Sequence, residues 1–284
     1  MNARWRLLLI PPFIFSVGLL LLTQGIFARV SFFRDLRHGK MEEVFQLTNY
    51  ITVFTDPYYL NSLILTIEIS VVVAILAVLL AYPVAYQLAR MPARRATLLL
   101  TIIVITSFIT IVIKVLGLII IFGADGPINY ALKAIGLIDQ PINLYGSSVG
   151  VLIGLLQYTL VFMVLILYSV IQSIPRSLEE AAEIHGASRW RVILKVVLPL
   201  SLPGVIAGAL TVFNLAAGAF TSAALLGGGK VLTLPVLIQQ EVIVNLNYGI
   251  GGTLSVILLL MVLGINLLSV WIVTRMRSSR LEVI

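Results

Sequence analysis

The sequence contains no cysteine, and only 11% of its 284 residues are charged. Without thiols the chain can form neither disulfides nor cysteine-ligated metal centres, and it has no thiolate nucleophile. Soluble domains carry about 25% charged residues, so the shortage of charge excludes an ordinary water-soluble domain. Hydrophobic residues make up 60% of the chain, and the mean hydropathy is +1.09. These values indicate an integral membrane protein.

Other familiar patterns are also missing. The two histidines, His38 and His185, lie in different loops and predict no metal site. Residues Gly227 to Lys230 resemble part of a phosphate-binding loop, but Ala224 occupies the position of its first glycine. No serine lies in a nucleophile-elbow pattern, and no paired carboxylates within a span indicate a proton relay. The sequence therefore predicts a protein that is not an enzyme and binds no cofactor or metal of its own.

Long apolar runs divide the chain into about six segments, each long enough to cross the roughly 30 Å hydrocarbon core as a helix. The predicted spans are residues 7–27, 60–86, 96–122, 148–171, 204–226 and 250–274. The first run follows a short basic leader but lacks a cleavage pattern, so it is predicted to remain as a helix. The sequence thus predicts an all-α membrane protein in which residues 1–284 form one transmembrane domain.

Positive charge concentrates in alternate loops. The termini and the loops after the second and fourth spans hold twelve basic and four acidic residues, whereas the other loops hold six basic and seven acidic residues. Because cytoplasmic loops carry an excess of lysine and arginine, we expect both termini and residues 173–203 on the cytoplasmic side. This asymmetry accounts for the net charge of +7, so the charge indicates membrane lipids, and no nucleic acid, as partners.

The loop between the fourth and fifth spans is the most highly charged segment, and its first half predicts a short helix. Pro175 ends the preceding span, because proline lacks an N–H and disfavours helix in the residue before it. Ser177 and Glu180 have the spacing of a capping box for a helix that extends to about His185. Gly186 then allows the left-handed turn that commonly ends helices.

The second half of this loop predicts another short helix. Ser188 is suited to cap it, and Pro199 and Pro203 are predicted to end it before the fifth span begins. Two helices joined by a tight turn make a compact cytoplasmic loop. We expect such a loop to form a binding surface for another protein.

The spacing of residues in this loop matches a known signature. Glu180-Ala181-Ala182 is followed after three residues by Gly186 and, after nine more, by Val196-x-Leu198-Pro199. This pattern resembles the E-A-A-x3-G-x9-I-x-L-P signature of permeases of binding-protein-dependent ABC transporters, with valine where isoleucine is usual. The position of the loop before the last two spans agrees with that family.

Other stretches point to a subfamily. Gly126 to Asn129, Gly136 to Asp139 and Ser177 to Arg191 make the chain similar to the spermidine/putrescine-type permeases. The resemblance implies the type I ABC importer permease fold in a bacterial inner membrane, and import of a polyamine or another small organic solute. It also implies a cytoplasmic ATPase dimer that binds ATP and Mg, an extracytoplasmic solute-binding protein, and a second permease subunit, with a heterodimer favoured over a homodimer.

The resemblance also assigns residues. Those it implies for coupling to the ATPase are Ser177, Glu179, Glu180, Ala181, Ala182, Gly186, Ala187, Leu198 and Pro199. From the residues alone, Glu180 could act only as a helix cap and the alanines only as helix formers. A helix that transmits force must be rigid, so the two interpretations are compatible.

A second set of residues lies within the spans, where packing between helices competes with a role in the solute path. This set is Glu68, Lys114, Phe213, Asn214, Phe220 and Thr221. Glu68 and Lys114 lie at similar predicted depths in consecutive antiparallel spans. Because a lone charge in hydrocarbon is costly, we expect these two side chains to form an ion pair, with binding of a cationic solute by Glu68 as the alternative.

Two other functional classes remain as alternatives. An ion-coupled secondary transporter would be expected to show an inverted repeat and more carboxylates within its spans. A scaffold without transport activity would need neither glycine-rich helix faces nor a docking loop. We further expect the loops around residues 28–59 and 128–135 to contact a binding protein, because they hold aromatic and charged residues on the outer side.

Overall fold

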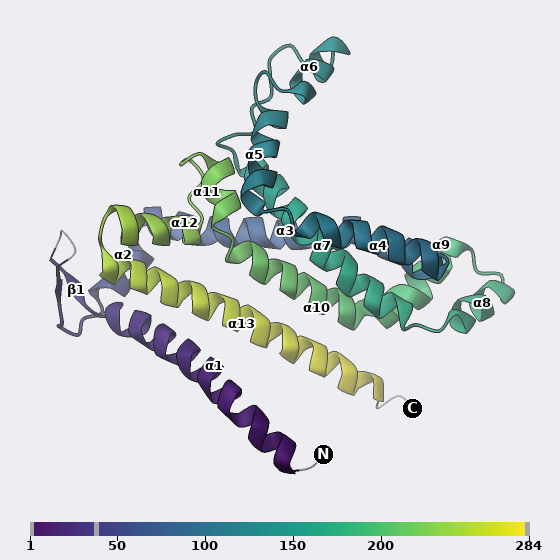
Figure 1. Cartoon of the computed structure of the whole chain (residues 1–284), viewed down its shortest axis with the longest axis horizontal. Coiled ribbons are helices and arrows are strands. Elements are labelled where there is room, and N and C mark those ends of the chain that lie inside the picture. The colour runs from purple at the N-terminus through teal and green to yellow at the C-terminus, as the bar shows by residue number, and fades with distance from the viewer. Residues whose placement is uncertain (1–2, 37–39, 282–284) are drawn as a thin grey trace. The chain divides into compact units, whose positions relative to one another are not determined.

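The computed structural model describes residues 3–36 and 40–281, with side chains described for residues 10–36 and 40–271. His38 therefore lies outside the described residues. The chain forms two compact units: Met1–Leu63 with Leu234–Leu263, and Ile64–Thr233 with Gly264–Ile284. Helices dominate both units (Figure 1).

The described residues include six helical segments that are long and apolar enough to cross a membrane. These segments are Ile10–Val30, Pro57–Arg90, Ile111–Ala134, Ser148–Gln172, Arg189–Ala217 and Tyr248–Trp271. Their number confirms the all-α architecture that the apolar runs predict. The bounds of the third and fifth segments differ from the prediction.

The first unit combines helices with a small hairpin. It contains α1 (Ala3–Val30), β1 (Arg34–Asp35), β2 (Met41–Glu42), α2 (Thr48–Thr55), the start of α3 (Pro57–Arg90), α12 (Leu234–Gln239), the π-helix η2 (Gln240–Val244) and α13 (Tyr248–Leu281) as far as Leu263. The strands pair antiparallel, with Arg34 opposite Glu42. The polar segment after the first span thus contains secondary structure that its composition does not predict.

Buried hydrogen bonds hold three parts of this unit together. The Asn49 amide donates to the carbonyl oxygens of Ser31 and Phe33, both at 2.9 Å, and the Thr253 hydroxyl donates to the Ser31 carbonyl at 3.1 Å. Gly252 allows the backbones to approach, since a Cβ there would lie 3.1 Å from the Phe27 carbonyl oxygen. The end of α1, helix α2 and the start of α13 are therefore fixed to one another.

The second unit is built around α7. Besides the remainder of α3 and α13, it contains α4 (Ala93–Ser107), α5 (Ile111–Phe122), α6 (Pro127–Ala134), α7 (Ser148–Gln172), α8 (Arg176–Ile184), α9 (Arg189–Val192), the π-helix η1 (Ile193–Val197), α10 (Leu198–Ala217) and α11 (Thr221–Gly227). Helix α7 lies beside α10 and α11 (Figure 1). Its buried side chains include Leu155, Met163, Leu167 and Ile171.

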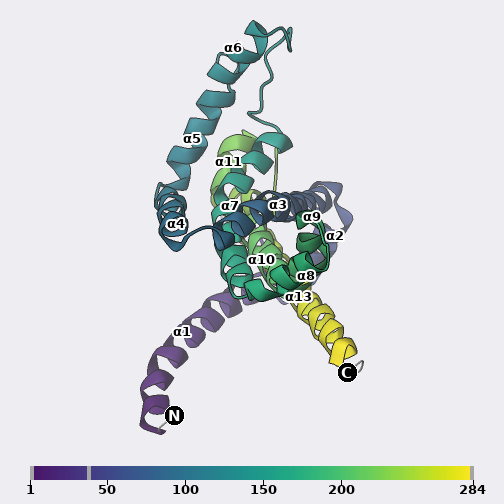
Figure 2. The ribbon, with the colours of Figure 1, turned by 90° about the vertical axis from the view of Figure 1, so that its right-hand side faces the viewer.

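The predicted third span is two helices instead of one. Helix α4 ends at Ser107 and α5 starts at Ile111, and the chain changes direction between them (Figure 2). The Thr106 and Ser107 hydroxyls bond to the carbonyls of Ile103 and Val104, both at 2.6 Å. Such side-chain bonds compete with the backbone helix ladder. No proline or glycine marks the break, so hydropathy alone could not locate it.

The fifth span also differs from the predicted 204–226. It runs from Arg189 to Ala217 and ends at Gly218, after which α11 forms a separate helix. The prediction that Pro199 and Pro203 end a helix before this span is wrong. Both prolines lie inside α10. Proline has no N–H to donate to the helix, and the π-helix η1 directly before them is the place where the backbone hydrogen bonding changes.

Glycines on α7 and α10 allow neighbouring helices to approach closely. A Cβ at Gly204 would lie 2.5 Å from Val170 Cγ2, and one at Gly208 would lie 2.6 Å from Met163 Sδ. A Cβ at Gly154 would lie 2.3 Å from Leu226 Cδ1. Small residues at such contacts are typical of helix pairs in membranes.

We therefore expect Gly204→Ala to destabilise the protein. The new methyl group would collide with the branched Val170 side chain, and overpacking of this kind costs about 1–3 kcal/mol. Gly264→Ala is the matched control, because no atom lies within 4 Å of a Cβ at Gly264 on α13. Thermal unfolding of the two purified variants in detergent measures the difference. Equal midpoints would contradict the packing role of Gly204.

Candidate functional site

Helix α8 lies between two spans and begins one residue earlier than its predicted cap. Pro175 occupies the N-cap position with ψ 133°, and the helix starts at Arg176. Ser177 is therefore already helical, and α8 has no side-chain hydrogen bond at its N-cap. The predicted capping box of Ser177 and Glu180 is wrong, because proline fixes the backbone at the start of this helix.

The turn after α8 confirms the prediction for Gly186. Its φ is +80°, the left-handed region that favours glycine. The Gly186 N–H donates to the Glu183 carbonyl at 2.9 Å, and the Ala187 N–H donates to the Ala182 carbonyl at 3.1 Å. These two bonds form a Schellman motif. Ser188 occupies the N-cap of α9 as predicted, but its side chain makes no capping hydrogen bond.

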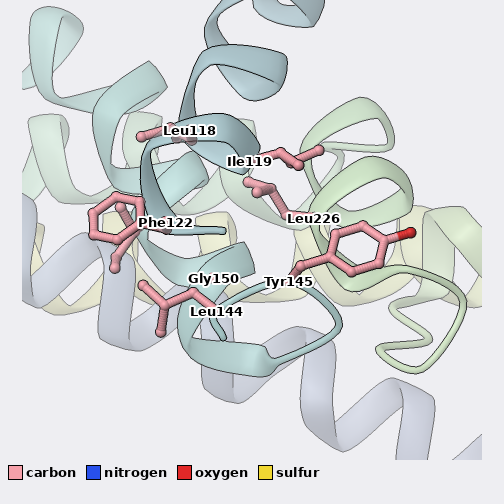
Figure 3. A pocket seen from close by; sticks show the side chains of 8 residues that line it. Leu118, Ile119, Phe122, Leu144, Tyr145, Gly150 and Leu226 are labelled. Carbon is pink, nitrogen blue, oxygen red and sulfur yellow. The ribbon is translucent and has the colours of Figure 1, made fainter. Parts of the chain in front are cut away.

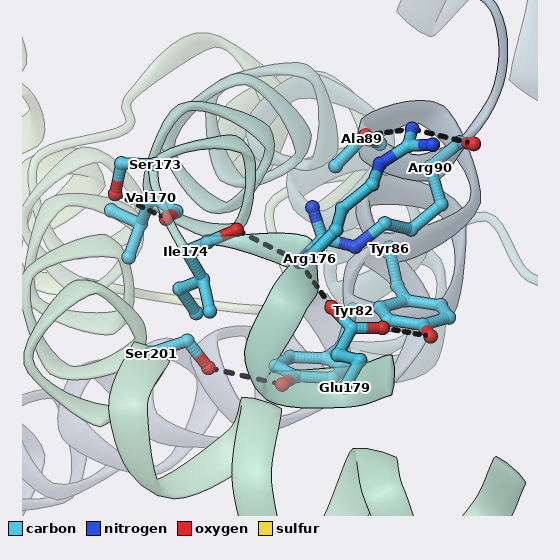
Figure 4. Close-up of polar contacts among 10 residues, drawn as sticks. All are labelled: Tyr82, Tyr86, Ala89, Arg90, Val170, Ser173, Ile174, Arg176, Glu179 and Ser201. Atoms are coloured by element: carbon cyan, nitrogen blue, oxygen red, sulfur yellow. Dashed lines mark hydrogen bonds and ion pairs between the residues drawn. The ribbon is translucent and has the colours of Figure 1, made fainter. Parts of the chain in front are cut away.

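One side chain of α8 points inward, and it is an acid. The Glu179 carboxylate accepts a 2.9 Å hydrogen bond from the Tyr86 hydroxyl and pairs with the Arg90 guanidinium (Figure 4). The pair is well shielded, since the side chains of Arg90 and Glu179 are only 14% and 11% exposed. The guanidinium also lies 5.9 Å from the centre of the Tyr86 ring. Helix α8 is thereby anchored to the end of α3.

Further bonds reinforce the same junction. The Arg176 guanidinium donates to the Arg90 carbonyl oxygen at 2.8 Å, and the Arg90 guanidinium donates to the Ile174 carbonyl oxygen at 3.4 Å (Figure 4). About two turns before Arg90 on α3, the hydroxyls of Tyr82 and Ser201 lie 3.0 Å apart, which links α3 to α10. The end of α3 is therefore bonded to both sides of the α8 loop.

The opposite face of α8 is open to solvent. Ala181 is exposed on that face and Ile184 is 84% exposed, while Glu180 and Glu183 are exposed beside it. Trp190, on α9, is 75% exposed. A groove of about 1050 Å³ runs between this loop and α3, and it is lined by Glu180, Glu183, Arg189, Trp190 and neighbouring residues of α3. An exposed apolar and acidic helix held on a rigid support is suited to contact another protein.

The residues assigned to coupling from the sequence separate into groups. Ser177, Glu180, Ala181 and Gly186 are exposed, whereas Ala182 and Ala187 are half-buried. Leu198 and Pro199 lie half-buried at the start of α10, and Glu179 faces α3. The sequence alone does not indicate Tyr86 as a partner of Glu179, and it indicates Arg90 only as a cytoplasmic charge. Their partner is distant in the sequence, so no local signal pairs them.

The predicted ion pair between Glu68 and Lys114 is absent among the described residues. Glu68 is exposed on α3, and Lys114 is half-buried in α5. The prediction assumed one straight third span. Because that span breaks before Ile111, Lys114 lies in the first turn of a new helix instead of deep within a long one.

The other candidate path residues lie at helix contacts. The side-chain amides of Asn214 on α10 and Asn266 on α13 bond to each other reciprocally, at 3.1 and 2.9 Å. Phe213 is buried, and Phe220 and Thr221 lie where α10 gives way to α11. For Asn214 the sequence favours a role in hydrogen bonding between helices over a role in lining a solute path, and the observed bonds agree with the first role.

A hollow between α5, α7 and α11 is too small to hold a solute. It is lined by apolar side chains such as Leu118, Phe122 and Leu226, with Tyr145 at its edge (Figure 3). Its volume is about 10 Å³, roughly the space of one water molecule. It is a packing gap beside Gly150.

Residues 74–279 match the family described as the binding-protein-dependent transport system inner membrane component. The chain is 32% identical over 239 residues to the spermidine/putrescine transport system permease protein PotB of Escherichia coli (strain K12), covering 84% of this chain and 86% of the relative. It is 38% identical over 144 residues to PotB of Haemophilus influenzae, covering 51% of this chain and half of that relative.

Among solved structures, the chain is similar to one in the crystal structure of a bacterial alginate ABC transporter in complex with an alginate pentasaccharide-bound periplasmic protein. The TM-score is 0.76 with 19% identity, covering 93% of this chain and 92% of the other. At this identity the likeness shows the fold, which is that of ABC importer permeases. The match over residues 74–279 and the similarity to PotB show the family. This chain therefore belongs to the binding-protein-dependent transport system inner membrane components, as a permease subunit of an ABC importer.

Proposed function

We propose that this permease subunit imports a polyamine such as spermidine or putrescine, and that α8 couples transport to a cytoplasmic ATPase dimer. The observation that carries the coupling is the two-sided character of α8. One face is fixed to α3 through Glu179 and Arg90, and the other presents Glu180, Ala181 and Ile184 to solvent. A pull on the exposed face is transmitted to α3, because the anchor leaves little freedom between them.

The substrate assignment is supported by the relatives. The PotB proteins of Escherichia coli and Haemophilus influenzae are named as spermidine/putrescine permeases. Polyamines are cationic, and Glu68 and Glu241 are carboxylates of this chain without an ion-pair partner among the described residues. Import of a different small solute is the second candidate. The resemblance of the α8 loop to the coupling signature supports both candidates equally, since that signature concerns the ATPase and not the choice of solute.

The proposed complex has four kinds of subunit. ATP and Mg bind to the ATPase pair and not to this chain, and a solute-binding protein delivers the polyamine on the outer side. A second, different permease subunit completes the pathway. The excess of basic residues beside α8 supports its cytoplasmic placement together with both termini.

Uptake by the reconstituted complex tests the function. The chain, the second permease and the ATPase are reconstituted into proteoliposomes with ATP inside and the solute-binding protein outside. We expect ATP-dependent accumulation of radiolabelled spermidine or putrescine, and no accumulation of sulfate as an anionic control. Accumulation of sulfate instead would contradict the polyamine assignment. Uptake without ATP would contradict the ABC mechanism.

A further inference from the structure

The first unit contains a buried acid that forms no ion pair with any of the described residues. Glu241 lies in η2, and the residue is only 4% exposed. One turn earlier on the same helix, Leu237 is fully buried in an apolar cluster with Val53 and Leu254. A carboxylate next to such a cluster is costly unless it is paired.

The described residues give this carboxylate one hydrogen bond and no positive charge. The Tyr59 hydroxyl donates to Glu241 Oε1 at 3.3 Å, a long bond. The ion pairs among the described residues are Arg29–Glu43, Arg34–Glu42 and Arg90–Glu179, so none of them involves Glu241. Because no described residue supplies the counter-charge, a bound cation or a proton would balance this carboxylate.

The backbone around Glu241 is irregular in two ways. Residues Gln240–Val244 form a π-helix, in which the Asn245 N–H reaches the Gln240 carbonyl at 2.9 Å. Shortly afterwards, Leu246 has φ +52°, a conformation that leucine rarely adopts. Single-turn π-helices and strained residues are both frequent at functional sites. They occur here within seven residues of one another, beside the unneutralised acid.

Two aromatic rings complete the cluster. The rings of Tyr58 and Tyr59 meet edge to face, with centres 5.3 Å apart. Tyr58 lies beside the Gln240 side chain and is 39% exposed. The cluster of Tyr58, Tyr59, Gln240 and Glu241 thus extends from a buried carboxylate to the surface.

We propose that this cluster is a binding site for a primary ammonium group, and that the ammonium belongs to the polyamine during import. The Glu241 carboxylate would accept hydrogen bonds from the ammonium, and the tyrosine rings would face its charge. A calcium or magnesium ion is a poorer fit, because these ions take about six or more oxygen ligands. The described residues contain no group of three or more acidic or histidine side chains that could hold a metal ion.

That the ammonium group belongs to a polyamine rests on the proposed function. One other molecule could supply the same group. The headgroup of phosphatidylethanolamine also carries a primary ammonium. The test must therefore separate a transported polyamine from a bound lipid, and both from a carboxyl group that is simply protonated.

Uptake by the reconstituted complex carrying Glu241→Gln provides this test. Glutamine keeps the shape and hydrogen bonding of a protonated carboxyl group but cannot balance an ammonium charge. We expect spermidine uptake to fall about tenfold or more, the typical effect of losing a charge-assisted hydrogen bond. Retention of the ATPase and its stimulation by the binding protein should stay within about twofold of wild type. Glu241→Asp, which keeps the charge, should recover part of the uptake.

Asp139→Asn is the control, because Asp139 is an exposed carboxylate outside the loops that are expected to contact the binding protein. An exposed charge of this kind contributes little, so uptake should not change. The comparison is made in liposomes of phosphatidylcholine and phosphatidylglycerol, with and without phosphatidylethanolamine. We expect the loss caused by Glu241→Gln in both membranes.

Three results would overturn the inference. Normal uptake with Glu241→Gln would show a protonated structural carboxyl group. A loss confined to membranes with phosphatidylethanolamine would assign the site to a lipid headgroup. Wild-type complex that imports neither spermidine nor putrescine would overturn the proposed substrate and this site together, whereas the first two results leave the proposed function intact. If the complex with Glu241→Gln does not assemble, uptake is measured with Tyr59→Phe instead. Lower uptake by this variant would support the site, and unchanged uptake would overturn it.

Discussion

A complex that carries Ala181→Arg is expected to lose its ATPase subunits while the permease chain stays folded in the membrane. Ala181 is exposed on α8, so the chain itself has room for a longer side chain. A docked ATPase would have to accommodate a large cation in the middle of the contact. Loss of about 2 kcal/mol at such a contact corresponds to roughly a 30-fold weaker interface. Co-purification of the ATPase with the tagged permease measures the effect.

Gln172→Arg is the control for this experiment. Gln172 is exposed at the end of α7, outside α8, and the substitution introduces the same side chain. We expect this variant to retain the ATPase at the wild-type level. Retention of the ATPase by Ala181→Arg, together with normal uptake, would show that α8 is not the docking element.

The second large effect is expected at the anchor beneath α8. Glu179→Ala leaves the Arg90 guanidinium shielded from solvent without its counter-charge, and removal of one partner from a buried ion pair typically costs about 3–5 kcal/mol. We expect less assembled complex. In the complex that does assemble, ATP hydrolysis should continue while uptake per ATP falls, because α8 no longer moves together with α3.

Two further variants separate the anchor from a general effect of charge. Asp139→Asn removes an exposed carboxylate elsewhere in the same unit, outside α8, and should leave assembly unchanged. The double variant Arg90→Met with Glu179→Met removes both charges, and replacing a buried pair by apolar residues is often nearly neutral. We expect it to recover assembly but not coupling. Wild-type coupling in Glu179→Ala would contradict the anchoring role.

Local chemistry made part of this structure predictable. The six spans follow from the length of the apolar runs, and the turn at Gly186 follows from the one residue type that adopts its backbone conformation without strain. The coupling signature was recognisable because its residues are close together in the chain. In each case the information lies within one turn or one helix.

The features that the sequence did not predict depend on contacts between distant segments or on backbone adjustments. Glu179 was assigned to the docking surface, but it faces Tyr86 and Arg90, which belong to an earlier helix. Pro199 and Pro203 remain within a helix because a π-turn precedes them. The break before Ile111 falls beside hydroxyl side chains that bond to backbone carbonyls, with no proline or glycine to mark it.

The same reasoning explains why Glu241 did not stand out in the sequence. It lies in a short apolar segment, and it is one of seven acidic residues spread over the predicted outer loops. Its burial and the absence of an ion-pair partner among the described residues become visible only when η2 is placed beside the start of α3 within the first unit. An unbalanced buried charge is a property of the folded chain.

We expect the exposed face of α8 to meet the ATPase, and photocrosslinking from a single cysteine can test this contact. The natural chain has no cysteine, so Ile184→Cys gives one attachment site for benzophenone-4-maleimide, on a residue that is 84% exposed. Tyr130→Cys on α6, at a residue 79% exposed and predicted to lie on the outer side, is the control. We expect the probe at residue 184 to capture the ATPase subunit and the probe at residue 130 to capture none. Capture of the ATPase from residue 130, or none from residue 184 in a complex that retains its ATPase, would contradict the claim.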